Sequence, residues 1–345
     1  MTSRRSGSTM SDLQSSRNLV CGLDLGGTKL LGVILDADTP PAADDTHFGI
    51  LLSKRVPTPH AGTEALVDAM TGLVADLRAQ ARDELGADIT AVGLGAPGLV
   101  DRDGVMHTGP NLPGIGRIGF AERISAATGL PTAVDNDATC AAWAEHERGE
   151  SGGHNHTLFL TLGTGIGAGV TVKGELLRGA NGFGGEAGHM VIDPNGPPCP
   201  CGRHGCWERY ASGSGLARIA RDAAEGGRAP RVVELAGGDP EDVRGEHVTR
   251  AALEGASGAH EIMAHFGWWV ALGIANLVAV LDSEMVIIGG GLIEAGAIVM
   301  DPIREAFPGL VIGATVRPAV PIEQATMGEW AGGIGAALLA AQRTG

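Results

Sequence analysis

Apolar residues occur along the chain in short stretches that end at glycine turns. The segments 23–35 and 160–172 each read as an apolar strand, a glycine turn and a second apolar strand, and each predicts a β-hairpin. The segments 91–98 and 285–291 each predict one apolar strand that ends in a glycine turn. Such pairs also arise by chance in α/β proteins, but two pairs in the same order favour a duplicated unit.

Helical spacing of apolar residues separates these strands. It predicts helices over 64–84, 120–128, 138–148 and 262–281. Strands that alternate with helices indicate an α/β fold, and a duplicated α/β unit predicts two lobes around a ligand cleft. The 262–281 segment is apolar enough to resemble a membrane span. Because His265 and Asn276 interrupt it, we interpret it as a buried core helix.

Composition and charge narrow the classes of function. The chain has 345 residues, of which 43% are hydrophobic and 19% charged, as in a soluble protein with two domains. Its net charge of −15 argues against nucleic acid or an anionic membrane as the main partner. We expect the polar residues 1–19 to be a disordered tail. No apolar stretch follows Arg4 and Arg5, so we expect no export signal and a cytoplasmic location.

Four potential metal ligands lie close together in the sequence: His189, Cys199, Cys201 and Cys206. Three thiols and an imidazole in one loop-rich stretch predict a tetrahedral zinc site. The alternative is a disulfide with an uninvolved histidine, although a C-x-C pair bridges poorly with itself. Glu186 and Glu208 flank the cluster, so the same loop can present carboxylates to a substrate.

Three glycine turns are candidates for contact with phosphate. Their residues are Asp24, Gly26, Gly27, Thr28 and Lys29 in the first, Gly163, Thr164 and Gly165 in the second, and Gly289, Gly290 and Gly291 in the third. Glycine lets backbone N–H groups approach an anion, and a carboxylate at the strand end can orient Mg²⁺ through water. The first turn lacks the G-x-x-x-x-G-K-[ST] pattern of a Walker A loop. It is not a Rossmann fingerprint either, because it joins two strands instead of opening a helix. Hairpin geometry alone explains each turn, but together they favour a nucleotide cleft.

Asp137 follows a short apolar strand and opens a predicted helix. A carboxylate is favoured in the first turn of a helix for structural reasons alone. The functional alternative is a general base that takes the proton of a sugar hydroxyl. Other polar residues can hydrogen-bond a polyol: Asn111, Asn136, Glu186, His189 and Glu208.

Five motifs together resemble the ROK family, which contains repressors and sugar kinases. They are D-x-G-G-T-K at 24–29, G-x-P-G-x-V-D at 95–101, N-D-A at 136–138, G-E-x-G-H at 185–189 and C-x-C-G-x-x-G-C-x-E at 199–208. The resemblance extends from about Val20 to the C-terminus. It implies a duplicated actin-like, hexokinase-type fold of the ribonuclease H-like class. The expected parts are a small lobe over 20–137, a large lobe with the zinc loop over 138–328, and a C-terminal helix over 329–345 that packs back on the small lobe.

The resemblance also implies an activity, since the chain looks most like the glucokinases of this family. These transfer a phosphoryl group from ATP to the 6-hydroxyl of glucose, with Mg²⁺ and with Asp137 as general base. The sugar would be bound by Gly98, Asn111, Asn136, Asp137, Gly167, Glu186, His189 and Glu208. The zinc on His189 and the three cysteines would be structural, because four protein ligands leave no open position. Family members are often homodimers or homotetramers.

Other interpretations stay open. Ile115 stands where many members carry Trp, so mannose, fructose, N-acetylglucosamine or N-acetylmannosamine can replace glucose as the expected substrate. A sugar-responsive regulator without catalysis would need a DNA-binding module, for which the tail is too short. Some relatives accept polyphosphate, but the cysteine cluster and the net charge of −15 favour ATP.

Overall fold

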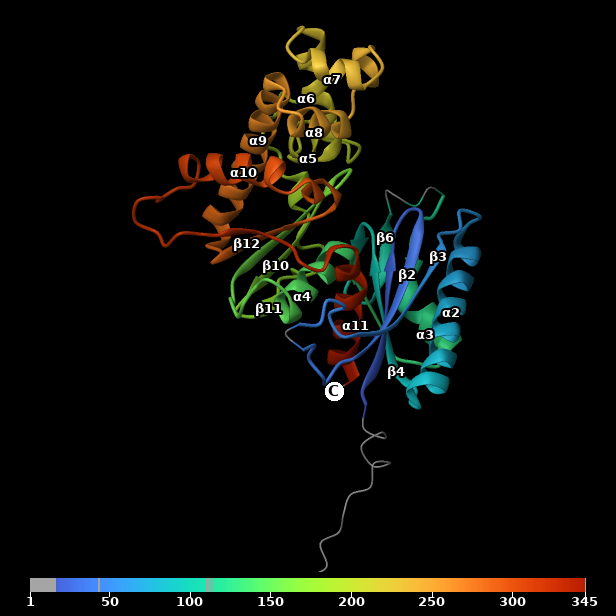
Figure 1. Ribbon diagram of the computed structural model, residues 1–345. Coiled ribbons are helices and arrows are strands. Elements are labelled where there is room, and N and C mark those ends of the chain that lie inside the picture. Colours follow the sequence, from blue (N-terminus) through green and yellow to red (C-terminus); the bar gives the residue numbers. More distant parts are fainter. Residues whose placement is uncertain (1–16, 43, 110–111, 113, 345) are drawn as a thin grey trace, which may run out of the picture. The chain divides into compact units, whose positions relative to one another are not determined.

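A computed structural model describes residues 17–42, 44–109, 112 and 114–344 (Figure 1). The chain divides into two compact units. Unit 1 comprises the chain up to Arg148, the segment Arg178–Phe183 and the chain from Glu329 onward. Unit 2 comprises Gly149–Leu177 and Gly184–Gly328.

A five-stranded sheet in the order β3-β2-β1-β4-β8 forms the centre of unit 1. Its strands are β1 (Leu19–Leu25), β2 (Lys29–Asp36), β3 (Ile50–Pro57), β4 (Ile89–Ala96) and β8 (Thr132–Asn136). The predicted hairpin over 23–35 is confirmed, since β1 and β2 pair antiparallel, and β4 and β8 continue the sheet in parallel. A small sheet contains β5 (Leu99–Val100), β6 (Val105–Thr108) and β7 (Ile118–Gly119).

Helices cover both faces of this sheet (Figure 1). One face carries α2 (Thr63–Gln80), its π-helical continuation η1 (Ala81–Leu85) and α3 (Phe120–Thr128); the other carries α4 (Asp137–Arg148) and α11 (Ala331–Thr344). The predicted helices over 64–84, 120–128 and 138–148 are therefore confirmed. Side chains of β1 alternate between the faces, so the odd-numbered residues of this strand enter the core under α2 and α3.

Glycines let α11 approach the sheet closely. A Cβ on Gly93 would lie 1.8 Å from the Ala336 carbonyl oxygen, and a Cβ on Gly22 would lie 1.9 Å from the Gly333 carbonyl oxygen. The expected C-terminal helix thus packs on β1 and β4. We predict a lobe boundary after Asp137, but unit 1 continues to Arg148, because α4 also packs on α11.

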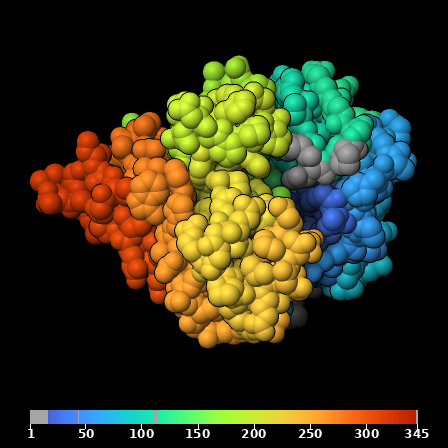
Figure 2. All heavy atoms as spheres, turned by 90° about the horizontal axis from the view of Figure 1, so that it is seen from above, coloured from blue at the N-terminus to red at the C-terminus, as the bar shows by residue number. Residues whose placement is uncertain are grey.

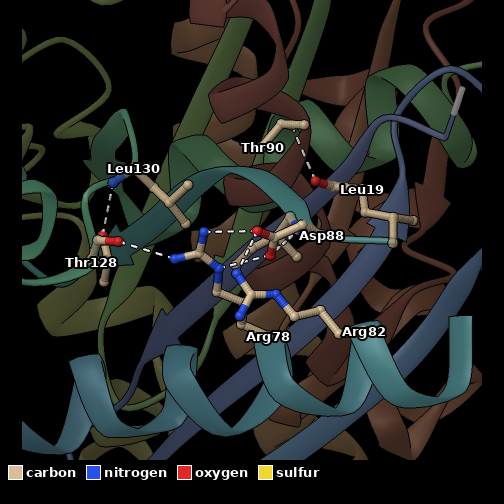
Figure 3. A network of polar contacts seen from close by, with 8 residues as sticks. Leu19, Arg78, Arg82, Asp88, Thr90, Thr128 and Leu130 are labelled. Carbon is tan, nitrogen blue, oxygen red and sulfur yellow. Dashed lines mark hydrogen bonds and ion pairs between the residues drawn. The ribbon is translucent and has the colours of Figure 1, made fainter. Parts of the chain in front are cut away.

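A network of charged residues ties three elements of unit 1 together (Figure 3). Arg78 near the end of α2 donates to both Asp88 oxygens, at 2.7 and 2.8 Å, and Arg82 donates to Asp88 at 2.7 Å. Arg78 also donates to the Thr128 carbonyl at the end of α3, at 3.1 Å. The Arg78 guanidinium holds the pKa of Asp88 far below its usual range. The start of β4 is thereby fixed against two helices.

Unit 2 repeats the same sheet topology. Its sheet has the order β11-β10-β9-β12-β13, with β9 (Thr157–Leu162), β10 (Ile166–Val172), β11 (Glu175–Leu176), β12 (Met285–Gly289) and β13 (Ile322–Gln324). β9 and β10 form the second predicted hairpin, and β12 and β13 continue the sheet in parallel. The order and directions match those of unit 1, so the predicted duplicated α/β fold is confirmed.

Helices also make up most of the remainder of unit 2. They are α5 (Glu208–Ala211), α6 (Gly213–Glu225), α7 (Pro230–Leu235), α8 (Gly245–Leu253), α9 (Ser257–Leu281) and α10 (Ala297–Ala306), with short 3-10 turns η2 (Ala187–His189), η3 (Pro240–Asp242), η4 (Gly291–Ala295) and η5 (Phe307–Gly309); η6 (Gly328–Trp330) leads back to unit 1. Figure 2 shows α6, α7 and α8 (yellow to light orange) side by side on one face of unit 2.

Helix α9 begins at Ser257, earlier than the predicted start at residue 262. Among the described residues it is the one helix with the length and composition of a membrane span, with a mean hydropathy of 1.6. Phe266, Val270 and Ile274 are fully buried in the core of unit 2. This burial supports the interpretation of α9 as a core helix.

The predicted tail over 1–19 extends too far along the chain. Residues 1–16 lie outside the described residues, but Leu19 is fully buried and begins β1. The polar composition of the tail ends at Asn18, and the apolar run that follows belongs to the sheet.

Candidate active site and metal centre

The first glycine turn connects β1 to β2 in unit 1. The Gly26 N–H donates to the Lys29 carbonyl at 3.0 Å, which closes the turn, and the Thr58 hydroxyl donates to the Gly26 carbonyl at 2.7 Å. Asp24 lies on the sheet face that α11 covers, where a Cβ on Gly332 would lie 2.7 Å from Asp24 Cγ. The turn thus holds a carboxylate under the start of α11.

Asp24 and Asp137 interact electrostatically. The pKa of Asp24 is raised to about 7, first by burial and then by the negative charge of Asp137, while Lys29 opposes the shift. Asp137 opens α4, directly after β8. The sheet therefore brings together the carboxylate of the first glycine turn and the carboxylate of the N-D-A motif.

Asn136 provides the cap of α4. Its side-chain oxygen accepts from the Thr139 N–H at 3.1 Å, whereas the Asp137 carboxylate accepts from the adjacent Ala138 N–H at 2.8 Å. Asn136 therefore caps α4, and Asp137 lies in the first turn of the helix, where a carboxylate is favoured for structural reasons alone. The Asn136 amide also donates to the Gly98 carbonyl at 3.1 Å, so two predicted sugar-binding residues lie together. Asn111, a third, lies outside the described residues.

Lys29 is paired with a residue that sequence reasoning missed. Its Nζ lies 2.7 Å from Glu329 Oε2, and Arg55 Nη2 lies 2.6 Å from Glu329 Oε1. The Arg55 guanidinium lies 4.7 Å from the centre of the Trp330 ring. Glu329 precedes α11 and is far from the glycine turn in sequence, so no local pattern links these residues.

The second and third glycine turns lie together in unit 2. A Cβ on Gly290 would lie 2.5 Å from the Leu162 carbonyl oxygen, and the Gly163 carbonyl accepts from the Gly213 N–H at 2.8 Å. The Gly167 N–H donates to the Thr161 hydroxyl at 3.3 Å. A Cβ on Gly165 would lie 2.8 Å from Glu208 Oε2. The second turn is therefore adjacent to a predicted sugar-binding carboxylate.

The four predicted metal ligands converge in unit 2. One ligand atom from each of His189, Cys199, Cys201 and Cys206 lies within 4.8 Å of all the others. His189 Nδ1 lies 3.7 Å from Cys199 Sγ, and the Sγ atoms of Cys201 and Cys206 are 3.5 Å apart. Tetrahedral zinc with Zn–S bonds of about 2.3 Å separates its ligands by about 3.8 Å. The cluster is compatible with zinc.

The disulfide alternative does not fit this geometry. All five cysteines of the chain are free. The 3.5 Å between Cys201 and Cys206 Sγ is far longer than a disulfide bond of about 2.05 Å.

Backbone hydrogen bonds shape the metal loop. The Cys199 N–H donates to the Arg203 carbonyl at 2.8 Å and forms a tight turn around Cys201. Gly205 has φ 65°, and a Cβ there would lie 1.5 Å from the Asp193 carbonyl oxygen, so the loop requires glycine at this position. Arg203 Nη2 donates to the His189 carbonyl at 2.7 Å. The loop therefore holds its ligands in place through contacts of its own.

Two predicted sugar-binding carboxylates flank the cluster. Glu208 Oε1 lies 3.2 Å from Cys199 Sγ and 3.6 Å from His189 Nδ1. Burial raises the pKa of Glu186, an effect that His189 opposes and Glu208 reinforces. With Nδ1 of His189 turned towards the thiols, Nε2 is the ring nitrogen left for other ligands.

Comparison with known proteins finds sugar kinases that are similar to this chain over most of its length. The chain is 37% identical to a glucokinase of Streptomyces coelicolor over 325 residues, 93% of this chain and 97% of that protein. It is 35% identical to an N-acetylmannosamine kinase of Shigella flexneri over 79% of this chain and 83% of that protein. A ROK family glucokinase from Streptomyces griseus, solved with glucose and AMPPNP, superposes with a TM-score of 0.77 at 35% identity, covering 95% of this chain and 100% of that one.

The model of the ROK family matches residues 20–343, which are nearly the whole described chain. This span includes the three glycine turns, the N-D-A motif and the metal cluster. The chain belongs to the ROK family.

Proposed function

We propose that this protein is a glucokinase, which transfers the γ-phosphoryl group of ATP to the 6-hydroxyl of glucose. The observation that supports this most is the sheet register, in which Asp24 of the first glycine turn pairs with Gly95 and Gly95 with Asp135, two residues before Asp137, whose charge raises the pKa of Asp24. A carboxylate at the phosphate-binding turn thereby lies near a carboxylate that can deprotonate a hydroxyl. The Streptomyces griseus relative, solved with glucose and AMPPNP, supports both ligands.

In the proposed mechanism, Asp137 accepts the proton of the sugar 6-hydroxyl as the hydroxyl oxygen attacks the γ-phosphorus. The bond between the γ-phosphorus and the β,γ-bridging oxygen breaks, and ADP leaves. The capping bond of Asn136 fixes the first turn of α4 and so orients Asp137. Asn111, Gly98 and Asn136 would contact the sugar from unit 1, and Gly167, Glu186, His189 and Glu208 from unit 2. Backbone N–H groups of the three glycine turns would bind the phosphates.

Two metal ions complete the proposal. Mg²⁺, when bound with ATP, neutralises charge on the phosphates, and Asp24 would orient it through water. The raised pKa of Asp24 suits this role, because the cation that would favour the ionised carboxylate arrives only with the nucleotide. Zinc on the three thiols and His189 would be structural, because four protein ligands leave no open position. It would fix the positions of Glu186 and Glu208.

We also infer a cytoplasmic homo-oligomer, a dimer or tetramer. Five free cysteines support a reducing compartment. A second candidate function is the phosphorylation of N-acetylmannosamine or another hexose, which the Shigella flexneri relative supports. The third is a sugar-responsive regulator without catalysis.

The test is ADP release with Mg-ATP in the presence of glucose, mannose, fructose, N-acetylglucosamine or N-acetylmannosamine. We expect kcat/KM to be highest for glucose. A higher kcat/KM for another sugar would change the assigned substrate, but the proposed mechanism would stand. If the protein binds glucose but releases no ADP, the kinase assignment is wrong and the proposal of a sugar-responsive regulator is favoured. Polyphosphate in place of ATP tests the donor, and equal rates would contradict the assignment of ATP.

A further inference from the structure

A cavity of about 280 Å³ in unit 1 has no role in the proposed reaction. None of the residues of the first glycine turn lines it, and neither does Asp137. Its walls come from β4, β8, α4, α11, the end of β5 with the two residues that follow it, and the segment Arg178–Phe183, which we call the strap.

The strap is fixed to unit 1 along its length. Arg178 Nε donates to Asp135 Oδ2 at 2.5 Å, and Arg102 Nη2 donates to the Gly179 carbonyl at 2.6 Å. A Cβ on Gly182 would lie 2.7 Å from the Val100 carbonyl oxygen. The ring of Phe183 meets the ring of His107 edge to face at 5.5 Å. The strap therefore forms a stable wall of the cavity.

Three guanidinium groups line this cavity, from Arg102, Arg178 and Arg343. The two carboxylates of the lining are already bound. Asp135 pairs with Arg178, and Asp101 lies 2.7 Å from His107 Nε2 and accepts two backbone N–H groups at 3.0 Å. In the part of the chain that the structure describes, Arg102 and Arg343 form no ion pair. The cavity therefore has positive charge that its own carboxylates do not neutralise.

Apolar residues complete the lining. Ala133 of β8 lies on the sheet face that α11 covers, Ala336 and Leu339 come from α11 itself, and Gln342 adds an amide. Guanidinium groups bind phosphate oxygens in pairs, because their N–H groups match the spacing of the oxygens. Ligand pockets commonly hold about 300–1,000 Å³, so this volume suits a molecule smaller than a nucleotide.

We propose that this cavity binds a small phosphate monoester, and that the hexose 6-phosphate formed by the proposed reaction is its ligand. The choice of hexose 6-phosphate rests on the proposed function, whereas the phosphate site rests on the three arginines. The phosphate lies between Arg102, Arg178 and Arg343, and the sugar ring lies against Ala133, Ala336 and Leu339.

Such a site has a consequence for catalysis. Asp135, the partner of Arg178, directly precedes Asn136 and Asp137 in β8 and α4. The other end of the strap continues through Gly184 to Glu186. A ligand on Arg178 is therefore linked to both segments, through Asp135 and through the strap.

Calorimetry on the full chain tests the site without requiring turnover. Glucose 6-phosphate and inorganic phosphate are each titrated into protein saturated with glucose, so that the sugar site is occupied. The variant is Arg343→Gln, at an exposed position near the end of α11. The control is Arg82→Gln, which changes an exposed arginine of unit 1 outside the cavity. A third variant, Arg343→Lys, keeps the positive charge but loses the paired N–H groups.

We expect glucose 6-phosphate to bind the wild type and Arg82→Gln equally, and Arg343→Gln at least tenfold more weakly. The affinity of Arg343→Lys for glucose 6-phosphate should lie between those of the wild type and Arg343→Gln. No binding to the wild type, or equal binding to all variants, would overturn the site. Inorganic phosphate binding as tightly as the ester would overturn the assignment of the sugar phosphate. A protein that binds the ester but releases no ADP with any sugar would contradict the proposed function alone.

Discussion

Lys29 Nζ lies 2.7 Å from Glu329 Oε2, which pairs a residue of the first glycine turn with the residue that precedes α11 by two positions. Arg55 shares the same carboxylate. The pKa of Glu329 is lowered, first by its hydrogen bond from Lys29, so the carboxylate is ionised at neutral pH. A negative charge therefore lies next to the turn that we assign to phosphate.

Glu329→Gln should lower the KM for ATP about two- to fivefold with little change in kcat, since it removes a charge that opposes phosphate and frees Lys29. Steady-state kinetics with varied Mg-ATP measures this. Asp76→Asn removes the partner of Lys54, a comparable exposed pair with 2.7 Å between its charged atoms, and is the control. A raised KM would show that Glu329 positions Lys29 instead of opposing the nucleotide. The same decrease in Asp76→Asn would show that the effect comes from overall charge and not from Glu329.

Asp137→Asn should reduce kcat about 10²- to 10⁴-fold, because the proton acceptor is lost while an amide of similar shape remains. The dissociation constant for glucose should change by less than a few fold. Coupled ADP release measures the first quantity and calorimetry the second. Asp68→Asn, an exposed change on α2, serves as control. Turnover of Asp137→Asn at the wild-type rate would show that Asp137 is not the general base.

Cys201→Ser should abolish stoichiometric zinc and raise the KM for the sugar about tenfold or more, since the metal would fix Glu186 and Glu208. Emission spectrometry gives the metal content, and the coupled assay gives the KM. Cys21→Ala, at a buried cysteine of β1 outside the cluster, should keep the metal. Normal zinc content in Cys201→Ser would refute the proposed ligand set.

Asp24 should make the stability of the nucleotide-free protein depend on pH. Its pKa is about 7 in the folded protein, and about 3.9 is usual for an unfolded chain. Between these values the folded state binds more protons, so the contribution of Asp24 to stability falls as pH rises from about 4 to 7. Asp24→Asn removes this dependence.

Thermal unfolding at pH 5 and pH 8, without nucleotide and without added Mg²⁺, measures this effect. Asp24→Asn should raise Tm relative to the wild type by more at pH 8 than at pH 5, whereas Asp68→Asn should show no such difference. An equal change in Tm at both pH values would mean that Asp24 ionises normally in the folded protein.

Local patterns predicted the elements that depend on near neighbours in sequence. Both hairpins follow from apolar alternation around a glycine turn, and α3 has the predicted bounds because its apolar residues repeat at helical spacing. The start of α9 was less well predicted, since the small and polar residues at 257–261 carry little apolar signal. The capping bond of Asn136 depends on backbone geometry that the sequence leaves ambiguous between Asn136 and Asp137.

By itself, the sequence determined the repeated order of hairpin and strand along the chain, the glycine turns and the grouping of four candidate metal ligands, His189, Cys199, Cys201 and Cys206. Each of these depends on residues within one segment, where spacing and residue type limit the backbone to few conformations. Only the tertiary structure decided that Glu329 binds Lys29, that Arg178 binds Asp135, and that a cavity with three arginines lies under the strap. These contacts join residues that are far apart in the chain. They form because α11 and the strap pack on the sheet of unit 1, and packing between distant segments leaves no periodic pattern in the sequence.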